Sequence, residues 1–359
     1  MAAAAQLRRG AVAAGATLAV ALASSGWQLD YAALSSGANV YFSSQRWGDV
    51  LDHAESIDGG LTTVTRRDTP APTVHTLLTN GKFQGNDALQ GEVQAQIGFA
   101  LAPLLHQDLR GAALVIGYGT GSTSRVFHDA GFERVDIAEL SGDIVRLADK
   151  YFASVNHLVS QAPGVHLNVT DGRNLLLLSQ QKYDVISIEI TSIWFAGAAS
   201  LYNQEFYRLA RSRMSEQGVL QQWVQMHRLS PLDILSIIST VRSEFRFVSL
   251  YLIGSQGILV ATNDETRAAA SAQAVAAIDT RPALAEVRRI AERDVKALTQ
   301  DLLLGPEGID RFIAGTGIRG DLWLSTDDNL QLEYSTPRAN VNDAEQSLLA
   351  NRAMLVQYR

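Results

Sequence analysis

Residues 112–131, "AALVIGYGTGSTSRVFHDAG", decide the fold of this chain. Five apolar residues run into Gly117, and a segment with helical polarity begins just after Gly121. A buried strand that enters a helix through a glycine-rich turn is typical of a βα unit in a parallel sheet. We therefore expect this stretch to form the centre of an α/β domain.

The chain downstream repeats this alternation. Further strands are expected at 134–140, 165–172, 183–190 and 218–226, with helices at 143–152 and 203–214 between them. A helix at 231–244 then precedes two strand candidates, 247–254 and 257–263, joined by a hairpin at 254–257. Strands alternating with helices of this length predict βαβ units and a parallel sheet covered on both faces.

Two further regions flank this core. Residues 39–85 contain short strand-like runs, beginning with "NVYF" at 39–42, and Asn80-Gly81 is a strong hairpin signal. They predict a small N-terminal antiparallel β-domain ahead of a Rossmann-like domain at 86–264. Residues 265–359 are rich in alanine and charge and predict a helical C-terminal extension and tail.

Composition excludes several classes of function. The 359 residues carry a net charge of −7 and contain no cysteine, so disulfides, thiolate metal sites and thiol nucleophiles are excluded. The acidic balance gives no nucleic-acid footprint. The histidines have no metal-ligand spacing, so we expect no metal.

The N-terminal segment, residues 1–30, combines Arg8-Arg9 with an apolar run from Ala11 to Ala23. That run is shorter than the roughly 20 apolar residues that a membrane-spanning helix needs. Four interpretations stay open: a signal-peptide core, a membrane-surface anchor, the remnant of a transmembrane helix, or an alanine-rich helix with no membrane role.

Candidate site residues gather at the expected strand ends. Gly117, Gly119 and Gly121 follow the first strand, Glu139 the second, Asp171-Gly172 the third and Glu189 the fourth. In an open parallel sheet, ligands bind at the carboxyl ends of the strands, near the switch in strand order. Glycines there allow a ligand to approach the backbone, and an acid about twenty residues on suits the hydroxyls of a ribose.

The glycine spacing separates two nucleoside-binding patterns. A dinucleotide fold typically has GxGxxG, whereas this chain has GxGxG with an acid after the third strand that suits an adenine amino group. This pattern is that of class I S-adenosylmethionine binders. We therefore expect an α/β fold with a Rossmann-like, class I methyltransferase-type sheet.

From about Asn39 to Arg338 the chain resembles the spermidine synthase (polyamine aminopropyltransferase) family, in particular its bacterial membrane-fused branch. The resemblance is carried by "NGKFQ", Gln96 ahead of "APLLHQD", "LVIGYGTGS", "DIAEL", "VTDGRN", "YDVISIEITSIWFAGAASLYNQEFYRLARSRM", "GVLQQWVQMHRLSP" and "STDDNLQLEYSTPR". It implies a homodimeric enzyme that transfers an aminopropyl group from decarboxylated S-adenosylmethionine to a diamine such as putrescine.

The resemblance also implies roles for single residues. Glu139 would hold the ribose, Asp171 the adenine, and Gln96 would lie against the donor. Glu189 falls where the family has its catalytic aspartate, which orients the attacking amine or draws its proton. A carboxylate there would both attract a protonated amine and help to make one nitrogen nucleophilic.

Two positions depart from the family pattern. Thr120 stands where the glycine loop of well-characterised synthases has an aspartate that binds the donor's amino group, and Ser192 replaces a second carboxylate that helps to hold the diamine. We expect Asp327 and Asp328, or Asp58, to supply the missing charge if the tail folds over the site. Tyr202 is a candidate substrate wall, because aromatic faces attract cations.

Two alternatives to aminopropyl transfer follow from Thr120. Without the loop aspartate the site accommodates intact S-adenosylmethionine, so a methyltransferase is the runner-up, and a non-catalytic nucleoside-binding domain of a membrane complex is a third possibility. Since adenosyl sulfonium donors are made in the cytosol, we expect a cytoplasmic domain acting on a small amine, with possible inner-membrane tethering through the N-terminus.

Overall fold

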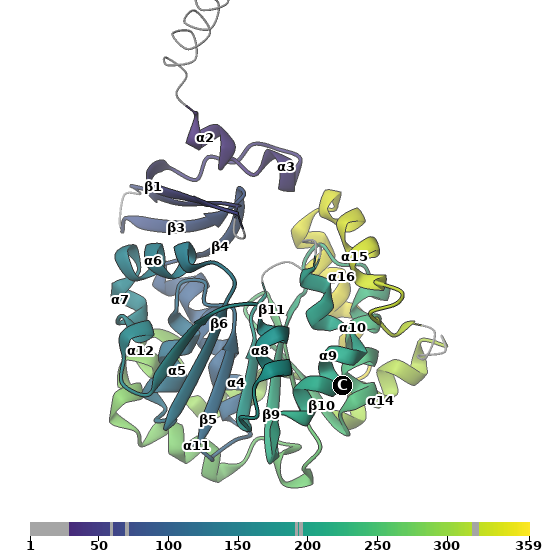
Figure 1. Cartoon of the computed structure of the whole chain (residues 1–359). Helices are drawn as coiled ribbons and strands as arrows, with labels where there is room; N and C mark the ends of the chain where they lie inside the picture. Colours follow the sequence, from purple (N-terminus) through teal and green to yellow (C-terminus); the bar gives the residue numbers. More distant parts are fainter. Residues whose placement is uncertain (1–28, 58–59, 69–71, 191–192, 194–196, 318–322) are drawn as a thin grey trace, which may run out of the picture.

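The computed structural model describes residues 29–57, 60–68, 72–190, 193, 197–317 and 323–359. Its main sheet has strand order β12-β10-β11-β9-β8-β5-β6-β7 (Figure 1). Five neighbouring strands are parallel, namely β5 (Ala112–Ile116), β6 (Arg134–Glu139), β7 (Val165–Val169), β8 (Tyr183–Ile188) and β9 (Met214–Gln225). The antiparallel strands are β10 (Phe247–Ile253), β11 (Gln256–Thr262) and β12 (Leu302–Leu304). This arrangement confirms the expected α/β sheet.

Helices cover both faces of the sheet because its strands are apolar on both sides. On β5, Ala113 and Val115 belong to one core cluster, and Leu114 and Ile116 to the other. The first face packs against α4 (Gln94–Leu104), α5 (Ser122–Asp129), α6 (Gly142–Tyr151), α7 (Ala153–Asn156), α11 (Ala272–Asp279), α12 (Ala285–Ala291) and α13 (Val295–Leu298). The second packs against α8 (Gly172–Leu178), α9 (Gln204–Ser212), α10 (Pro231–Glu244), α14 (Pro306–Gly315), α15 (Gln331–Ser335) and α16 (Ala344–Val356).

Short helical turns connect these elements. They are η1 (Leu89–Val93), η2 (Val159–Gln161), η3 (Ala198–Tyr202), η4 (Glu265–Arg267), η5 (Pro282–Leu284), η6 (Thr299–Asp301) and η8 (Thr336–Val341). Among the helices, α10 shows clear start signals, since Ser230 and Asp233 form a capping box around Pro231.

The N-terminal β-domain is a second, antiparallel sheet in the order β1-β2-β3-β4. Its strands are β1 (Asp49–Ser56), β2 (Gly60–Arg67), β3 (Val74–Thr79) and β4 (Lys82–Asn86), and Asn80-Gly81 forms the expected hairpin turn. The sheet lies over one end of the main sheet (Figure 1). A salt bridge of 2.7 Å from Lys150 on α6 to Asp52 on β1 joins the two.

One expected strand is absent. Residues 39–42 do not form a strand; instead α3 (Ala38–Tyr41) is a single helical turn, preceded by α2 (Tyr31–Leu34). The turn begins after Gly37, whose φ is 70°, and ends at Phe42, whose φ is 55°. These left-handed residues break the extended backbone that the aromatic and β-branched composition of "NVYF" favours.

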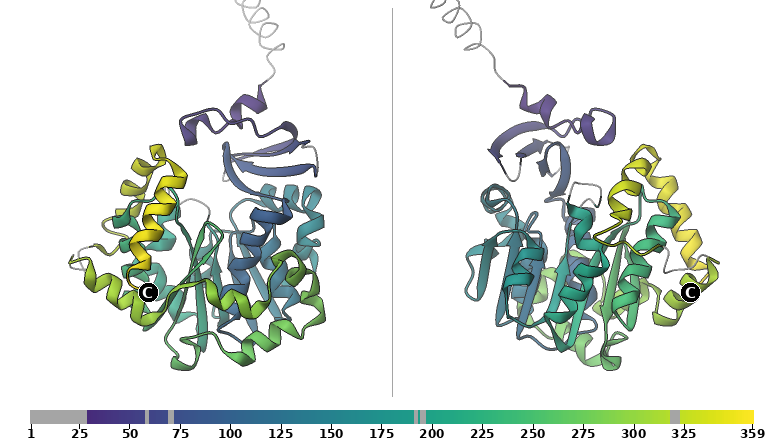
Figure 2. Two further views of the ribbon diagram at one scale, coloured as in Figure 1. Left: turned by 180° about the vertical axis from the view of Figure 1, so that it is seen from behind. Right: turned by 45° about the vertical axis from the view of Figure 1, so that its right-hand side comes forward.

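The C-terminal extension is more than a helical tail. Figure 2 shows it passing behind the main sheet before it reaches the last helices. Helices α11 to α13 pack on the first face, β12 pairs with β10 at the sheet edge, and α14 and α16 pack on the second face. The extension thus completes the sheet, so the expected boundary at residue 265 does not separate an independent core.

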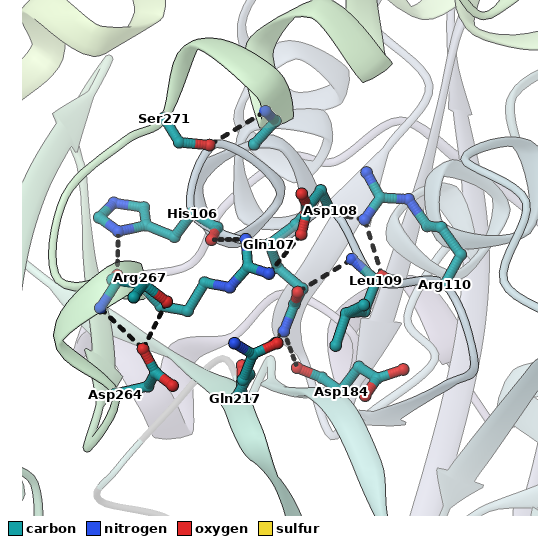
Figure 3. Close-up of polar contacts among 12 residues, drawn as sticks. His106, Gln107, Asp108, Leu109, Arg110, Asp184, Gln217, Asp264, Arg267 and Ser271 are labelled. Carbon is teal, nitrogen blue, oxygen red and sulfur yellow. Dashed lines mark hydrogen bonds and ion pairs between the residues drawn. The ribbon is translucent and has the colours of Figure 1, made fainter.

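A polar network joins this extension to the base of the sheet (Figure 3). His106 lies 2.8 Å from the carbonyl oxygen of Arg267 through Nδ1, and the Arg267 guanidinium forms an ion pair with Asp108. Gln107 donates to the carbonyl oxygens of Asp184 and Gln217 at 3.2 and 2.6 Å. The network precedes β5, so it lies at the sheet end opposite to the carboxyl ends of the parallel strands.

Residues 1–28, which hold most of the expected anchor segment, lie outside the described part of the chain, as does Asp58. No helix within the described ranges is long and apolar enough to cross a membrane.

Candidate functional site

A cavity of about 750 Å³ lies between the small sheet and the carboxyl ends of the parallel strands. Its volume falls in the range of small-molecule sites. The cavity meets the switch point of the main sheet, because β5 and β8 are neighbours but their following loops lead to opposite faces. Gly117 and Glu189, the residues that follow these two strands, both line it.

The glycine turn after β5 is shaped by close backbone contact. Gly117 has φ of 97°, and a Cβ there would lie 3.3 Å from the carbonyl oxygen of Glu189. Gly119, with φ of 53°, faces open space in the cavity, since the nearest atom to a Cβ would be 3.9 Å away. The backbone can therefore approach a ligand at Gly119.

Gly121, the third glycine of the turn, is packed against neighbouring side chains. It is not among the residues that line the cavity. A Cβ on Gly121 would lie 2.7 Å from the ring of Tyr118, whose hydroxyl donates to Asp149 at 2.8 Å. Gly121 therefore allows the turn to pack closely against the Tyr118 ring.

Glu139, the last residue of β6, is 7% exposed and lines the cavity. Backbone amides fix its carboxylate: Tyr118 N–H donates to Oε2 at 2.8 Å and Ser141 N–H to Oε1 at 3.0 Å. Burial raises the pKa of Glu139, while these amide donors lower it. An oriented carboxylate with free lone pairs can accept hydrogen bonds from two neighbouring hydroxyls of a ligand.

Asp171 and Gly172 line the same cavity at the start of α8. One oxygen of Asp171 caps the helix, accepting from the Asn174 amide at 2.9 Å. Gly172 sits against β5, because a Cβ there would lie 2.4 Å from Ile116 Cγ2. The cap holds the Asp171 carboxylate at the rim, where its second oxygen is free of the cap.

Glu189 is half-buried, and its side chain lines the cavity. Burial raises the pKa of Glu189 to about 8, although the hydroxyls of Thr123 and Ser187 act in the opposite direction. Ser187 Oγ lies 3.0 Å from Glu189 Oε1. A carboxyl group with this pKa exchanges a proton readily near neutral pH, as a general base must.

Gln96 on α4 joins the glycine turn to a further carboxylate. Its Oε1 accepts from Thr120 Oγ1 at 2.5 Å, and its Nε2 donates to Glu92 Oε1 at 3.0 Å. Thr120, Gln96 and Glu92 all line the cavity. Burial raises the pKa of Glu92 to about 7. Although Thr120 itself carries no charge, a carboxylate thus lies one hydrogen-bonded residue away.

Three of the expected acceptor-binding residues, Tyr202, Asp327 and Asp328, are not among the lining residues of the cavity. Tyr202 lies in the core, with its hydroxyl donating to the Trp223 carbonyl oxygen at 2.9 Å. Asp327 forms an ion pair with Arg173 and accepts from Asn203 at 3.1 Å, which holds its loop against α8 and α9. Asp328 is exposed in the same turn and is not a lining residue. Ser192 lies outside the described residues.

Apart from His227, which follows the strand candidate 218–226 on the rim of the site, the polar residues of a second wall of the cavity were not identified from the sequence. The small sheet, the segment before α4, the end of β9 and the β10–β11 hairpin contribute polar residues to the lining, namely Lys82, Gln84, Glu92, Gln225, His227 and Gln256. Lys82 follows the Asn80-Gly81 turn and His227 follows β9, so both positions carried a signal. Their convergence depends on how the two sheets dock, which no local pattern encodes.

The described residues contain no group of three or more histidine, aspartate or glutamate side chains that could hold a metal ion.

The chain is similar in sequence to one group of known enzymes. Residues 100–254 match the model of the spermine/spermidine synthase domain. The polyamine aminopropyltransferase of Nitrosomonas europaea is 30% identical over 153 residues, which are 42% of this chain and 46% of that protein. Polyamine aminopropyltransferase 2 of Hyperthermus butylicus is 30% identical over 151 residues, which are 42% of this chain and 49% of that protein. The matched regions thus span about half the length of these relatives.

Two solved structures share the fold. A spermidine synthase from Thermotoga maritima matches with a TM-score of 0.53 and 17% identity, and a spermidine synthase in complex with the transition state analogue AdoDATO with 0.54 and 16%. Each match covers 68% of this chain and 88% of the other. The resemblance to the spermidine synthase family and the Rossmann-like fold are therefore both confirmed, whereas the comparisons do not test the expected membrane-fused branch.

Proposed function

We propose that this chain, whose residues 100–254 match the spermine/spermidine synthase domain, transfers an aminopropyl group from decarboxylated S-adenosylmethionine to an amine. The observation that carries this proposal is the meeting of Gly117, Glu139 and Glu189 in one cavity at the switch point of the sheet. The first two suit a nucleoside, and the third suits an amine.

The donor would lie along the carboxyl ends of β5, β6 and β7. Glu139 would accept hydrogen bonds from the ribose hydroxyls, and Asp171 would lie beside the adenine. Gln96 and Glu92 would lie at the other end of the donor, where a carboxylate attracts the ammonium of an aminopropyl chain. These assignments need no movement of the glycine turn, because Gly119 leaves the backbone open to the ligand.

Glu189 would act on the acceptor amine. The amine nitrogen attacks the carbon that is bonded to the sulfonium, the carbon–sulfur bond breaks, and its electrons leave with the neutral thioether. The nitrogen then loses a proton, which the Glu189 carboxylate accepts. Because Glu189 emerges beside the glycine turn, it can hold the amine in line with that bond.

The test is a pair of calorimetric titrations with decarboxylated and intact S-adenosylmethionine. We expect tighter binding of the decarboxylated donor, because both donors carry the ammonium that Glu92 would hold, whereas only the intact donor also brings a carboxylate close to the Glu92 carboxyl group. Tighter binding of the intact donor, with methylation of an acceptor, would favour the methyltransferase alternative. Donor binding without any turnover would favour the non-catalytic alternative.

We place the reaction in the cytosol, where sulfonium nucleosides are made. The resemblance also supports a homodimer, and residues 1–30 are a candidate membrane tether. Sedimentation of the purified chain and membrane flotation with and without residues 1–30 would test these two proposals.

A further inference from the structure

The end of the cavity near the small sheet holds positive charges that the proposed reaction does not use. Lys82 and His227 line the cavity, and Arg228 is the next residue along the chain. The Lys82 Nζ lies 5.8 Å from the centroid of the Tyr41 ring, and the Arg228 Cζ lies 5.2 Å from the same centroid. One aromatic ring therefore gathers two cations at this end.

Neither cation is neutralised by a direct partner. Within the described ranges, Lys82 and Arg228 form no ion pair at 4.0 Å or less. The Nε of Arg228 is buried and has no hydrogen-bond partner there. A buried donor without a partner costs free energy, which an anionic ligand would recover.

The backbone holds Arg228 in an uncommon conformation. Its φ is 58°, in the left-handed region that a residue other than glycine rarely adopts. Such conformations often occur at functional sites, where the surrounding structure maintains them. Arg228 thus combines a strained backbone with a buried Nε that has no hydrogen-bond partner.

The charges at this end do not cancel near neutral pH. Burial lowers the pKa of Lys82 to about 8 and that of His227 to about 4, and Arg228 acts in the same direction on both. Glu92 interacts with Lys82, but burial raises the pKa of Glu92 to about 7. Two cations thus meet one partly protonated carboxyl group and a neutral histidine.

This basic end is separated from Glu189 along β9. The register of β8 and β9 pairs Ile188 with Gln222, which places Glu189 beside Trp223. Gln225 lies two residues further out, about 7 Å at roughly 3.3 Å per residue, and its Nε2 donates to the His227 carbonyl oxygen at 2.9 Å. A ligand can therefore present an amine to Glu189 and a different group to Lys82, since both residues line the cavity.

We propose that Lys82, which lines the cavity, binds a carboxylate of the ligand, and that Arg228, which shares the Tyr41 ring with Lys82, adds to the positive charge there. This inference rests on the proposed function and specifies its substrate class: the acceptor is an amine that also carries a carboxylate. A simple diamine would place its second ammonium near two cations and one carboxyl group. The same chemistry would also accept the carboxylate of an intact sulfonium donor, and the experiment separates these two sources.

The experiment measures dissociation constants by calorimetry on the full chain for two matched pairs of probes. The acceptor pair is 1,4-diaminobutane and ornithine, which is the same diamine with a carboxylate. The donor pair is decarboxylated and intact S-adenosylmethionine. We expect ornithine to bind at least tenfold more tightly than 1,4-diaminobutane, as one charge-assisted contact allows. A preference for the carboxylate in the donor pair alone would assign the basic end to the donor and overturn the acceptor assignment.

Variants then test which residues cause the preference for a carboxylate. Lys82→Met should remove the preference for the carboxylate, and Lys82→Arg should retain most of it. Lys182→Met is the matched control, because Lys182 precedes β8 at the end opposite to Glu189. If Lys82→Met does not fold, as circular dichroism would reveal, Arg228→Gln takes its place. No carboxylate preference in either pair, or a preference that survives loss of either charge, would overturn the proposal. Because binding heat requires no turnover, this outcome is distinguishable from failure of aminopropyl transfer, which product analysis detects.

Discussion

At the scale of single residues, Glu189 is the group on which the proposed chemistry depends. It follows a fully buried stretch of β8, yet its carboxyl group reaches a cavity rather than a partner of opposite charge. Glu189→Gln keeps the shape but removes the proton acceptor. We expect kcat to fall by about 100-fold or more.

The matched control is Glu216→Gln, an exposed glutamate on β9 that should leave kcat unchanged. Steady-state kinetics at saturating donor and acceptor would measure both variants. A Glu189→Gln variant with kcat within a few-fold of the unsubstituted chain would rule out a proton-transfer role.

The same residue predicts a pH effect on stability. The pKa of Glu189 rises from an ordinary value of 4.5 to about 8 in the folded chain, chiefly through burial. The folded state therefore binds more protons than the unfolded state between these values, and stability falls as the pH rises through that window. Glu189→Gln removes this loss. The stability of the variant relative to the unsubstituted chain should therefore increase between pH 4 and pH 8, by on the order of 4 kcal/mol.

Urea denaturation at the two pH values, compared with Glu216→Gln, would measure the effect. A stability difference that does not change with pH would contradict the raised pKa.

At the scale of elements, the turn between β5 and α5 controls ligand access. Gly117→Ala places a Cβ 3.3 Å from the Glu189 carbonyl oxygen at a φ of 97°. We expect a loss of about 1–2 kcal/mol in stability and at least tenfold weaker donor binding, because Glu189 and the turn must shift apart.

Gly317→Ala has a comparable φ of 65° but nothing within 4 Å, so it should lose stability without weakening donor binding. Calorimetric titration of both variants with the donor would separate the effect of backbone strain, which both share, from the effect of the close contact with the Glu189 carbonyl oxygen, which only Gly117→Ala has. Equal donor affinity in both variants would show that the turn tolerates the shift.

Patterns within elements predicted much of the site. Glu139 and Glu189 each follow an apolar run whose end is legible in the sequence, and parallel strands bring such ends to one edge. Tyr202 could not be assigned in this way, because an aromatic residue near a strand end is equally suited to the core, where its hydroxyl found a carbonyl partner. Asp327 pairs with Arg173, which is 154 residues away in the chain, so this partner could not be identified from a local pattern.

At the scale of the whole molecule, the cavity is assembled from segments that fold in different layers. Lys82 comes from the small sheet, Glu92 from the segment before α4, and His227 from the end of β9. Their positions follow from the docking of one sheet on another, so periodicity alone could not identify them. β12 was missed for a related reason, since a three-residue strand is too short to show alternation.

At the base of the sheet, we expect a substitution to lower the stability of the chain without changing its affinity for the donor. The ion pair between Arg267 and Asp108 is largely buried, with side-chain exposures of 10% and 12%. Arg267→Met leaves Asp108 without its partner, and we expect a loss of about 3–5 kcal/mol. Donor affinity should stay within about twofold, because the network lies at the opposite end of β5.

Arg146→Met, which breaks an exposed pair with Asp143, should cost less than 1 kcal/mol. Urea denaturation and donor titration on the two variants would test this separation. A large loss of donor affinity in folded Arg267→Met would show that the two ends of the sheet are coupled.

The most direct test of the account is product analysis by mass spectrometry. The full chain would be incubated with decarboxylated S-adenosylmethionine and with either 1,4-diaminobutane or ornithine, with Glu189→Gln in parallel. We predict methylthioadenosine together with an acceptor that has gained one aminopropyl group, and about 100-fold less of both products in the same time with Glu189→Gln. Methylation of an acceptor by intact S-adenosylmethionine, with no aminopropyl product from the decarboxylated donor, would contradict it.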